Sequence, residues 1–268
     1  MRSALNAAAA ALVAGAAAPA SAQILGAGGS WGGAYLGVSP GIKLGDATWT
    51  ATQLNGGGAG GTPFTAVDGS SPRTYSLTAA RLGGFAGVNW QFGPWVAGPE
   101  AGFAWSDEKK MRALFPGCGL GCSGFFPDPG PNDTTSVRLQ WDATIGGRAG
   151  YLVAPQRLLY GTAGLALQQV ETTGACMNPT LNSQYCFGPG PQSPIRHGLT
   201  LVGFTVGSGL ETQLAANWFA RGEYRFSYFP EVSDTMAFLP SQTGLSNTYR
   251  YRLSAQTHIL SVGLAYKF

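Results

Sequence analysis

Few side chains in this sequence could do chemistry: four cysteines, two histidines and a set of charged residues that recur at every second position. The cysteines form two close pairs, Cys118 with Cys122 and Cys176 with Cys186, in stretches rich in Gly and Pro. These spacings are not a standard zinc pattern, whereas close thiols in an exported protein pair with each other. We therefore expect two loop disulfides, no metal site and no cofactor.

The histidines do not indicate a catalytic site. His197 lies in an expected loop, and the sequence shows no Ser/acid arrangement near it; His258 shares the parity of Leu260 and Val262, on an apolar face. Neither pattern supports a triad. The glycine-rich run at 56–61 lacks a following Lys-Ser/Thr and a strand-to-helix context, so it is no phosphate loop. The sequence therefore predicts a protein that is not an enzyme.

The charged residues alternate with apolar ones, and this alternation identifies the elements that hold them. From 137 to 151 the odd positions are largely apolar, and the even positions are polar, charged or Gly. From 218 to 228, Arg221, Glu223 and Arg225 share one face and aromatic residues share the other. A period of two predicts β-strands with one apolar and one wet face.

The same pattern continues along the chain and predicts eight strands. They span 32–42, 74–91, 95–107, 135–153, 157–170, 199–214, 217–229 and 249–268. Tight turns at 92–94, 154–156 and 215–216 alternate with long connections at 43–73, 108–134, 171–198 and 230–248. Short turns at one end and long loops at the other are typical of bacterial outer-membrane barrels. We expect an all-β fold, an eight-stranded antiparallel up-and-down transmembrane β-barrel with four long external loops.

Composition and the first residues agree with export to a membrane. The 268 residues include 41 Gly and are 12% aromatic but only 11% charged, whereas a soluble domain carries about twice that charge. Arg2, an apolar stretch at 7–18 and the small residues at 20–22 form a signal peptide, so we expect a signal peptide at 1–22 and a barrel domain at 23–268. The formal charge of +3 implies no nucleic-acid partner.

Three pairs of aromatic residues indicate where the lipid would lie. In each pair the two residues are ten positions apart and share one strand face; they are Trp95 and Trp105, Trp141 and Tyr151, and Trp218 and Tyr228. Ten residues at about 3.4 Å, tilted by about 40°, rise roughly 26 Å, which matches the roughly 25 Å apolar band of such barrels. We expect these residues to form two aromatic girdles.

The cost of a charge in lipid predicts which face is internal. Arg or Lys on the lipid face near the midplane costs about 2–4 kcal/mol, so the charged faces must point into the lumen. Parity then places six cations and four acids there: Arg81, Glu100, Arg138, Asp142, Arg148, Glu211, Arg221, Glu223, Arg225 and Lys267. An eight-stranded barrel is just wide enough for its own side chains, so we expect no wide pore. Two interpretations stay open for Glu100, Arg148, Glu211 and Arg221: a gate, or a packed salt-bridged filling.

Pro99 departs from the pattern because it lies within an expected strand. Proline supplies no N–H to the ladder, and a closed barrel has no free edge where that loss could be tolerated. We therefore expect a bulge or a local break near Gly98 and Pro99.

Several strand motifs resemble those of the small porin-like outer-membrane proteins of the OmpA-type and opacity-protein superfamily. They are Trp31-Gly-Gly-Ala-Tyr35-Leu-Gly37, the segment 83–91, Gly147-Arg148-Ala-Gly150-Tyr151, Trp218-x-x-Arg221-x-Glu223-Tyr224 and Val262-Gly-Leu264-Ala-Tyr266-Lys-Phe268. The C-terminal Phe268 resembles the assembly signal of such barrels. The resemblance implies outer-membrane lipid and the barrel-assembly machinery as partners, and a Gram-negative outer membrane as the location.

Three functions remain for such a barrel. The first is a structural role in envelope integrity, with at most a narrow gated passage; the resemblance implies the word porin. The alternative is surface binding through loops that contain Phe115, Phe125, Phe126, Tyr185 and Phe187, because exposed loop aromatics can mark a binding patch. Here the resemblance permits haem binding or adhesion. A lipid-modifying enzyme is the least favoured.

Overall fold

The structure, a computed structural model, describes residues 31–57, 63–64, 67–117, 134–175, 194–238 and 247–268. Its strands are β1 (Gly33–Gly57), β2 (Pro63–Phe64), β3 (Arg73–Phe92), β4 (Trp95–Ser106), β5 (Glu108–Ala113), β6 (Thr134–Ala154), β7 (Arg157–Ala175), β8 (Ile195–Ala215), β9 (Trp218–Phe238) and β10 (Asn247–Lys267). No helix in these ranges is long and apolar enough to cross a membrane. The expected signal peptide and all four cysteines lie outside the described residues.

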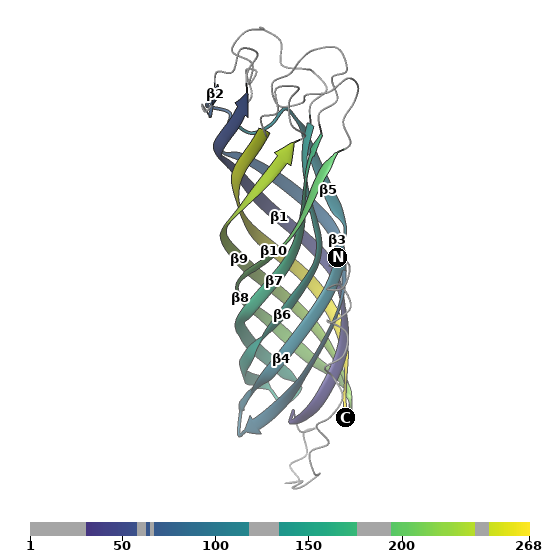
Figure 1. Cartoon of the computed structure of the whole chain (residues 1–268). Coiled ribbons are helices and arrows are strands. Elements are labelled where there is room, and N and C mark those ends of the chain that lie inside the picture. Colours follow the sequence, from purple (N-terminus) through teal and green to yellow (C-terminus); the bar gives the residue numbers. More distant parts are fainter. Residues whose placement is uncertain (1–30, 58–62, 65–66, 118–133, 176–193, 239–246) are drawn as a thin grey trace, which may run out of the picture.

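The strands close into an antiparallel barrel (Figure 1). The order is β10-β9-β8-β7-β6-β4-β3-β1, and β1 pairs with β10 to close the ring. Of the ten strands, β2 only adds a two-residue ladder to β1, and β4 and β5 pair with successive parts of β6. The ring therefore has eight strand positions, with β4 and β5 sharing one of them, which confirms the predicted eight-stranded fold.

The two ends of the barrel differ. Tight turns join β3 to β4, β6 to β7 and β8 to β9, and they lie at the end that also holds the C-terminus (Figure 1). The two short strands, β2 and β5, lie at the opposite end. Short turns face the periplasm in barrels of this kind, so the end with the long connections is the external end.

The strands are longer at the external end than the sequence pattern predicts. Strand β1 ends at Gly57 rather than at 42, β7 at Ala175 rather than at 170, and β9 at Phe238 rather than at 229. Parts of the predicted loops 43–73, 108–134, 171–198 and 230–248 are therefore strand, and those predictions are wrong at their edges. The alternation with an apolar outer face ends where the predicted strands stop, but the hydrogen-bonded ladders between the strands continue.

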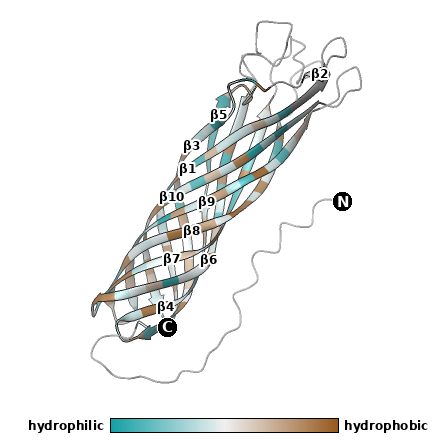
Figure 2. Cartoon of the chain, turned by 90° about the vertical axis from the view of Figure 1, so that its left-hand side faces the viewer, coloured by the Kyte–Doolittle hydropathy of each residue, from teal (hydrophilic) through white to brown (hydrophobic). Residues whose placement is uncertain are grey.

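The reason is that the wall changes polarity along its length. In the periplasmic half of β1 the outward residues are apolar and exposed, as at Leu36, Val38 and Ile42. Further along the same strand, Thr48 faces outward and Trp49 is buried inside. Figure 2 shows hydrophobic and hydrophilic residues alternating along the strands. The external half is built like a water-soluble barrel with an apolar interior.

Several ladders contain a register shift, and two of these shifts change which residues of β6 and β9 face inward. The register between β6 and β7 shifts between Leu139 and Asp142, so the inward positions of β6 are odd before the shift and even after it. The register of β9 against β10 shifts opposite Leu253 to Ala255, where β9 carries Pro230. A bulge tolerates proline because the extra residue is unpaired.

Pro99 faces lipid at a local break in the wall. The β3–β4 ladder pairs Gly87 with Glu100 and then Trp90 with Ala97, and neither Gly98 nor Pro99 has a partner on that side. The register is unchanged across the gap, and pairing with β6 continues through both residues. The expected irregularity is thus a break without a bulge. A Cβ on Gly98 would lie 1.8 Å from the Val88 carbonyl oxygen, so this close approach requires glycine.

Candidate functional site

The lumen of the membrane-spanning half is filled by a cluster of alternating charges, here the Glu–Arg cluster. It consists of Glu100, Arg148, Glu211, Arg221, Glu223 and Arg225, from β4, β6, β8 and β9. Arg148 binds Glu211 with two hydrogen bonds of 2.9 and 2.8 Å. Arg221 bridges Glu100 at 2.6 Å and Glu211 at 2.8 Å. Three carboxylates and three guanidiniums balance, so the cluster carries no formal charge.

Two tyrosines complete the hydrogen bonding of this cluster. Tyr35 donates to Glu100 at 2.9 Å, and Tyr160 donates to Glu223 at 2.7 Å. The Arg148 guanidinium also lies 4.2 Å from the centre of the Tyr160 ring. Charge-assisted bonds of this kind are stronger than neutral ones, and a fully satisfied network is rigid.

The two cavities described beside the cluster are small. One cavity beside Glu100, Thr144 and Arg225 and another beside Tyr35 and Asn89 each hold about 10 Å³. That is roughly the volume needed for a single water molecule. Neither of these two cavities has room for a hydrated solute.

A second charged cluster lies further toward the external end. Asp142 binds Lys43 at 2.6 Å and Arg81 at 2.8 Å. The Lys43 ammonium also donates to Ser106 at 2.8 Å and to Gln168 at 3.1 Å. Sequence reasoning missed Lys43, because the predicted strand ended at 42; its odd parity with the inward Tyr35 would have placed it in the lumen if β1 had been extended.

Above these charges the lumen holds an aromatic core, whose largest members are Trp49, Tyr75, Phe115, Phe229, Met236, Tyr249 and Tyr251. The rings of Trp49 and Tyr251 are 4.6 Å apart, and those of Phe115 and Tyr249 are 5.6 Å apart. Phe115 follows β5 and is 7% exposed. The expectation that it is an exposed loop aromatic is wrong, since it packs into the mouth of the barrel. Phe125, Phe126, Tyr185 and Phe187 lie outside the described residues.

Nine of the ten residues expected in the lumen point inward, but Arg138 does not. Arg138 precedes the β6 bulge, so its even position faces outward there, and it binds Asp107 on the exterior at 2.6 Å. The assignment of Arg138 to the lumen is therefore wrong. Lys267 faces inward at the periplasmic mouth, 5.8 Å from the Phe219 ring centre.

The expected girdle residues face outward at two levels. At the periplasmic end Trp95 contacts Tyr151, with ring centres 5.1 Å apart, and Trp218 contacts Tyr266 at the same distance. At the other level are Trp105, which is exposed, Trp141, which stacks on Phe103, and Tyr228, which contacts Phe204. Phe268 is 73% exposed at the periplasmic end; its role as an assembly signal stays a prediction.

The histidines occupy two different environments. His258 faces outward and hydrogen-bonds the Tyr224 hydroxyl at 2.7 Å, near the outer aromatic level. His197, expected in a loop, belongs to β8 and does have an acidic partner: its Nδ1 lies 2.8 Å from Asp234, which also accepts a bond from Tyr251 at 2.7 Å. Burial raises the pKa of the Asp234 carboxyl, but the bonds from Tyr251 and His197 outweigh it and hold that pKa below its usual range.

The closed ring, the charged lumen and the outward aromatic levels are the features of an outer-membrane barrel. The family model for the outer membrane protein beta-barrel domain matches residues 7–268. This chain belongs to that family.

The chain is also similar to several proteins named as outer-membrane proteins. The 31 kDa outer-membrane immunogenic protein of Brucella melitensis is 26% identical over 252 residues, which cover 89% of this chain and 84% of that protein. The 22 kDa outer membrane protein of Rhizobium leguminosarum is 29% identical, over 74% of this chain and 64% of that protein. The chain is thus an outer-membrane protein, as its sequence predicts.

A solved structure supports the fold independently. The outer membrane protease OmpT of Escherichia coli superposes with a TM-score of 0.52 at 12% identity, over 88% of this chain and 97% of that chain. At this identity the likeness shows the fold alone. The Brucella relatives carry no enzyme name, whereas OmpT is named a protease.

Proposed function

We propose that this barrel is a closed structural protein of the outer membrane, which supports envelope integrity and does not conduct solutes. The main support for this proposal is that side chains fill the described lumen in three successive layers. These layers are the Glu–Arg cluster, the Lys43–Asp142 cluster and the aromatic core. A narrow gated passage would have to displace all three.

The energetics favour a filling over a gate. Removing one partner from a buried ion pair costs about 3–5 kcal/mol, because the other charge remains buried without a counter-charge. Arg221 pairs with Glu100, Glu211 and Glu223, so moving it would break three such pairs. A gate of this kind would have to offset the cost of breaking these pairs.

The test is complementation of a strain that lacks this protein. Cells without it should become sensitive to detergents and large antibiotics, and the wild-type chain should restore resistance without changing the uptake of small solutes. The matched control is Arg138→Met, which removes an external cation and should complement fully. Reduced solute uptake in the deletion strain, with unchanged detergent resistance, would support a porin and contradict this proposal.

A second candidate function, surface binding, is favoured by the height of the wall. Between Tyr228 at the outer aromatic level and Phe238, β9 continues for ten residues, a rise of roughly 26 Å at about 3.4 Å per residue and 40° tilt. The external end of the described wall therefore rises well above the lipid. Haemin binding to intact cells, compared between the wild-type chain and one with the segment 176–193 shortened, tests this candidate; equal binding by both would contradict it.

We propose no catalytic role. Among the described residues, the ring of His197 has one side-chain partner, Asp234, and no Ser, Thr or Cys side chain bonds to that ring. Nucleophilic catalysis requires such a neighbour. Hydrolysis of a fluorogenic peptide or of phospholipid by the refolded chain, abolished by His197→Asn, would contradict this.

A further inference from the structure

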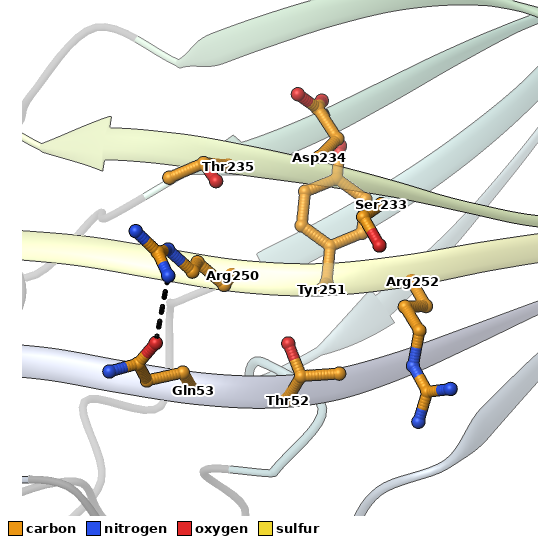
Figure 3. A pocket seen from close by; sticks show the side chains of 8 residues that line it. All are labelled: Thr52, Gln53, Ser233, Asp234, Thr235, Arg250, Tyr251 and Arg252. Carbon is orange, nitrogen blue, oxygen red and sulfur yellow. Dashed lines mark hydrogen bonds between the residues drawn. The ribbon is translucent and has the colours of Figure 1, made fainter.

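The external wall carries a hollow that the closed-barrel role does not use. It lies where β9, β10 and β1 run side by side and has a volume of about 550 Å³ (Figure 3). We call it the arginine hollow. Its lining residues are Thr52, Gln53, Ser233, Asp234, Thr235, Arg250, Tyr251 and Arg252.

The hollow opens sideways and not into the lumen. Arg250, Arg252, Ser233 and Thr235 are exposed, whereas Tyr251 between the two arginines is 0% exposed and packs in the aromatic core. A ligand therefore has to approach from outside the barrel, along the wall.

The two guanidiniums are available to an anion. Arg250 donates to a neutral partner, the Gln53 side-chain oxygen, at 3.2 Å. Arg252 pairs with Glu231 at 2.7 Å, and both side chains are about half exposed, at 47% and 45%. Such an exposed pair contributes little, so a more highly charged anion can displace Glu231. The Asp234 carboxylate lines the hollow too, but its Oδ2 atom is bound by His197 and Tyr251.

Hydroxyl groups flank the arginines on the neighbouring strand. The β9–β10 register places Thr235 opposite Arg250 and Ser233 opposite Arg252. Guanidiniums bind phosphate oxygens with two parallel hydrogen bonds, and hydroxyls and amides can bind the hydroxyls of a sugar. This combination fits a phosphorylated saccharide.

The height of the hollow indicates the source of that saccharide. Arg252 lies six residues beyond His258, which marks the outer aromatic level on β10, and this corresponds to about 16 Å along the barrel axis. That is the level of sugar headgroups above the membrane surface. We propose that the arginine hollow binds the phosphorylated sugar headgroup of a glycolipid in the outer leaflet.

The test is calorimetric titration of the refolded full chain with rough-form lipopolysaccharide, which carries lipid A and phosphorylated inner-core sugars. Arg250→Ala combined with Arg252→Ala should weaken binding about tenfold, the effect of losing roughly one charge-assisted contact in water. Glu231→Gln should tighten binding about twofold, because it frees Arg252. Arg196→Ala, which removes an exposed cation of β8 outside the hollow, should leave binding unchanged.

Further titrations distinguish a specific site for a phosphorylated headgroup from diffuse charge attraction and from binding of a soluble ligand. The wild-type chain should bind dephosphorylated lipopolysaccharide at least several-fold more weakly. Equal weakening by Arg196→Ala and by the double variant would show diffuse charge attraction and would overturn the proposal. Tighter binding of a soluble phosphorylated oligosaccharide than of the lipid would overturn the membrane source. A boiling-dependent shift in gel migration verifies that each variant is folded, and Glu231→Gln gives a test that loss of folding cannot mimic.

Discussion

Arg148 is the buried cation whose removal should destabilise the barrel most clearly. It is bound by Glu211 through two hydrogen bonds and stacks on Tyr160. Arg148→Met leaves part of the Glu211 charge buried without its counter-charge and should lower the free energy of unfolding by about 3–5 kcal/mol. Urea unfolding of the refolded protein, followed by gel migration, measures this.

Arg138 provides the matched control for that experiment. Its ion pair with Asp107 is on the exterior and substantially exposed, and such pairs contribute about 0–1 kcal/mol. Arg138→Met should therefore change stability by less than about 1 kcal/mol. If the two variants unfold at the same urea concentration, Arg148 does not hold the lumen together.

Gly209 should be required because Tyr160 occupies the space of its missing side chain. A Cβ at Gly209 would lie 2.4 Å from the Tyr160 hydroxyl oxygen, which would separate Tyr160 from Glu223. Gly209→Val should destabilise the barrel by about 1–3 kcal/mol, the usual cost of overpacking. At Gly222 no atom lies within 4 Å of the added Cβ, so Gly222→Ala should be neutral or stabilising in the same urea titration; a loss at Gly222 equal to that at Gly209 would contradict this account.

At the level of residues, parity predicted most of the lumen and failed at two identifiable places. Arg148, Glu211 and Arg221 follow from the alternation alone. Arg138 does not, because an unsignalled bulge follows it, and Lys43 does not, because its strand continues past the alternation with an apolar outer face. The tyrosine partners could not be predicted, since they depend on which strands become neighbours.

At the level of elements, a hydrogen-bonded chain joins four neighbouring strands near the external mouth. Thr172 of β7, His197 of β8, Asp234 of β9 and Tyr251 of β10 are linked through the Tyr251 hydroxyl and the Asp234 carboxylate. These bonds fix the ends of strands that carry long connections. The external ends of β8 and β9 should therefore lose protection when Asp234 is neutralised.

The pH dependence of this four-strand hydrogen-bonded chain follows from the pKa of Asp234. The folded-state pKa lies below the unfolded value of about 3.9, so the contribution to stability is complete above about pH 4 and is lost as the pH falls through the folded pKa. Amide-exchange protection of segments 195–201 and 230–238 should fall below about pH 4 in the wild type. Asp234→Asn should lower that protection at pH 7 and remove its acid dependence; a wild-type profile that is flat down to pH 3 would contradict the assignment.

The strand pattern explains why the fold was predictable and its external part was not. Between the two aromatic levels, contact with lipid requires that apolar and polar residues alternate strictly. All eight strand positions and the three tight turns follow from this alternation. Beyond the outer level the outward residues are polar, as at Thr48 and Arg252, while the inward ones are apolar, as at Trp49 and Leu253. Polar and apolar residues still alternate there, but the apolar ones face inward. A search for strands with an apolar outer face therefore assigns those segments to loops.

For the whole molecule, the change of polarity accounts for the location in a membrane and for the filling of the described lumen. One half is apolar outside and charged inside, as a membrane requires, and the other is polar outside and apolar inside, as water requires. The charged filling and the aromatic core are stacked along one axis. Opening a path through the described lumen would require disrupting a salt-bridged network and an apolar core together.

Single-channel conductance of the refolded full chain in a planar bilayer tests most directly the proposal that the lumen is closed to solutes. A closed lumen predicts a silent bilayer for the wild type, with folding verified by boiling-dependent gel migration and with a general porin as the conducting control. It also predicts that neutralising Glu100, Arg148 and Arg221 together leaves the bilayer silent, because the aromatic core remains. Discrete wild-type openings whose size changes in that triple variant would contradict the account and establish a gated channel through the Glu–Arg cluster.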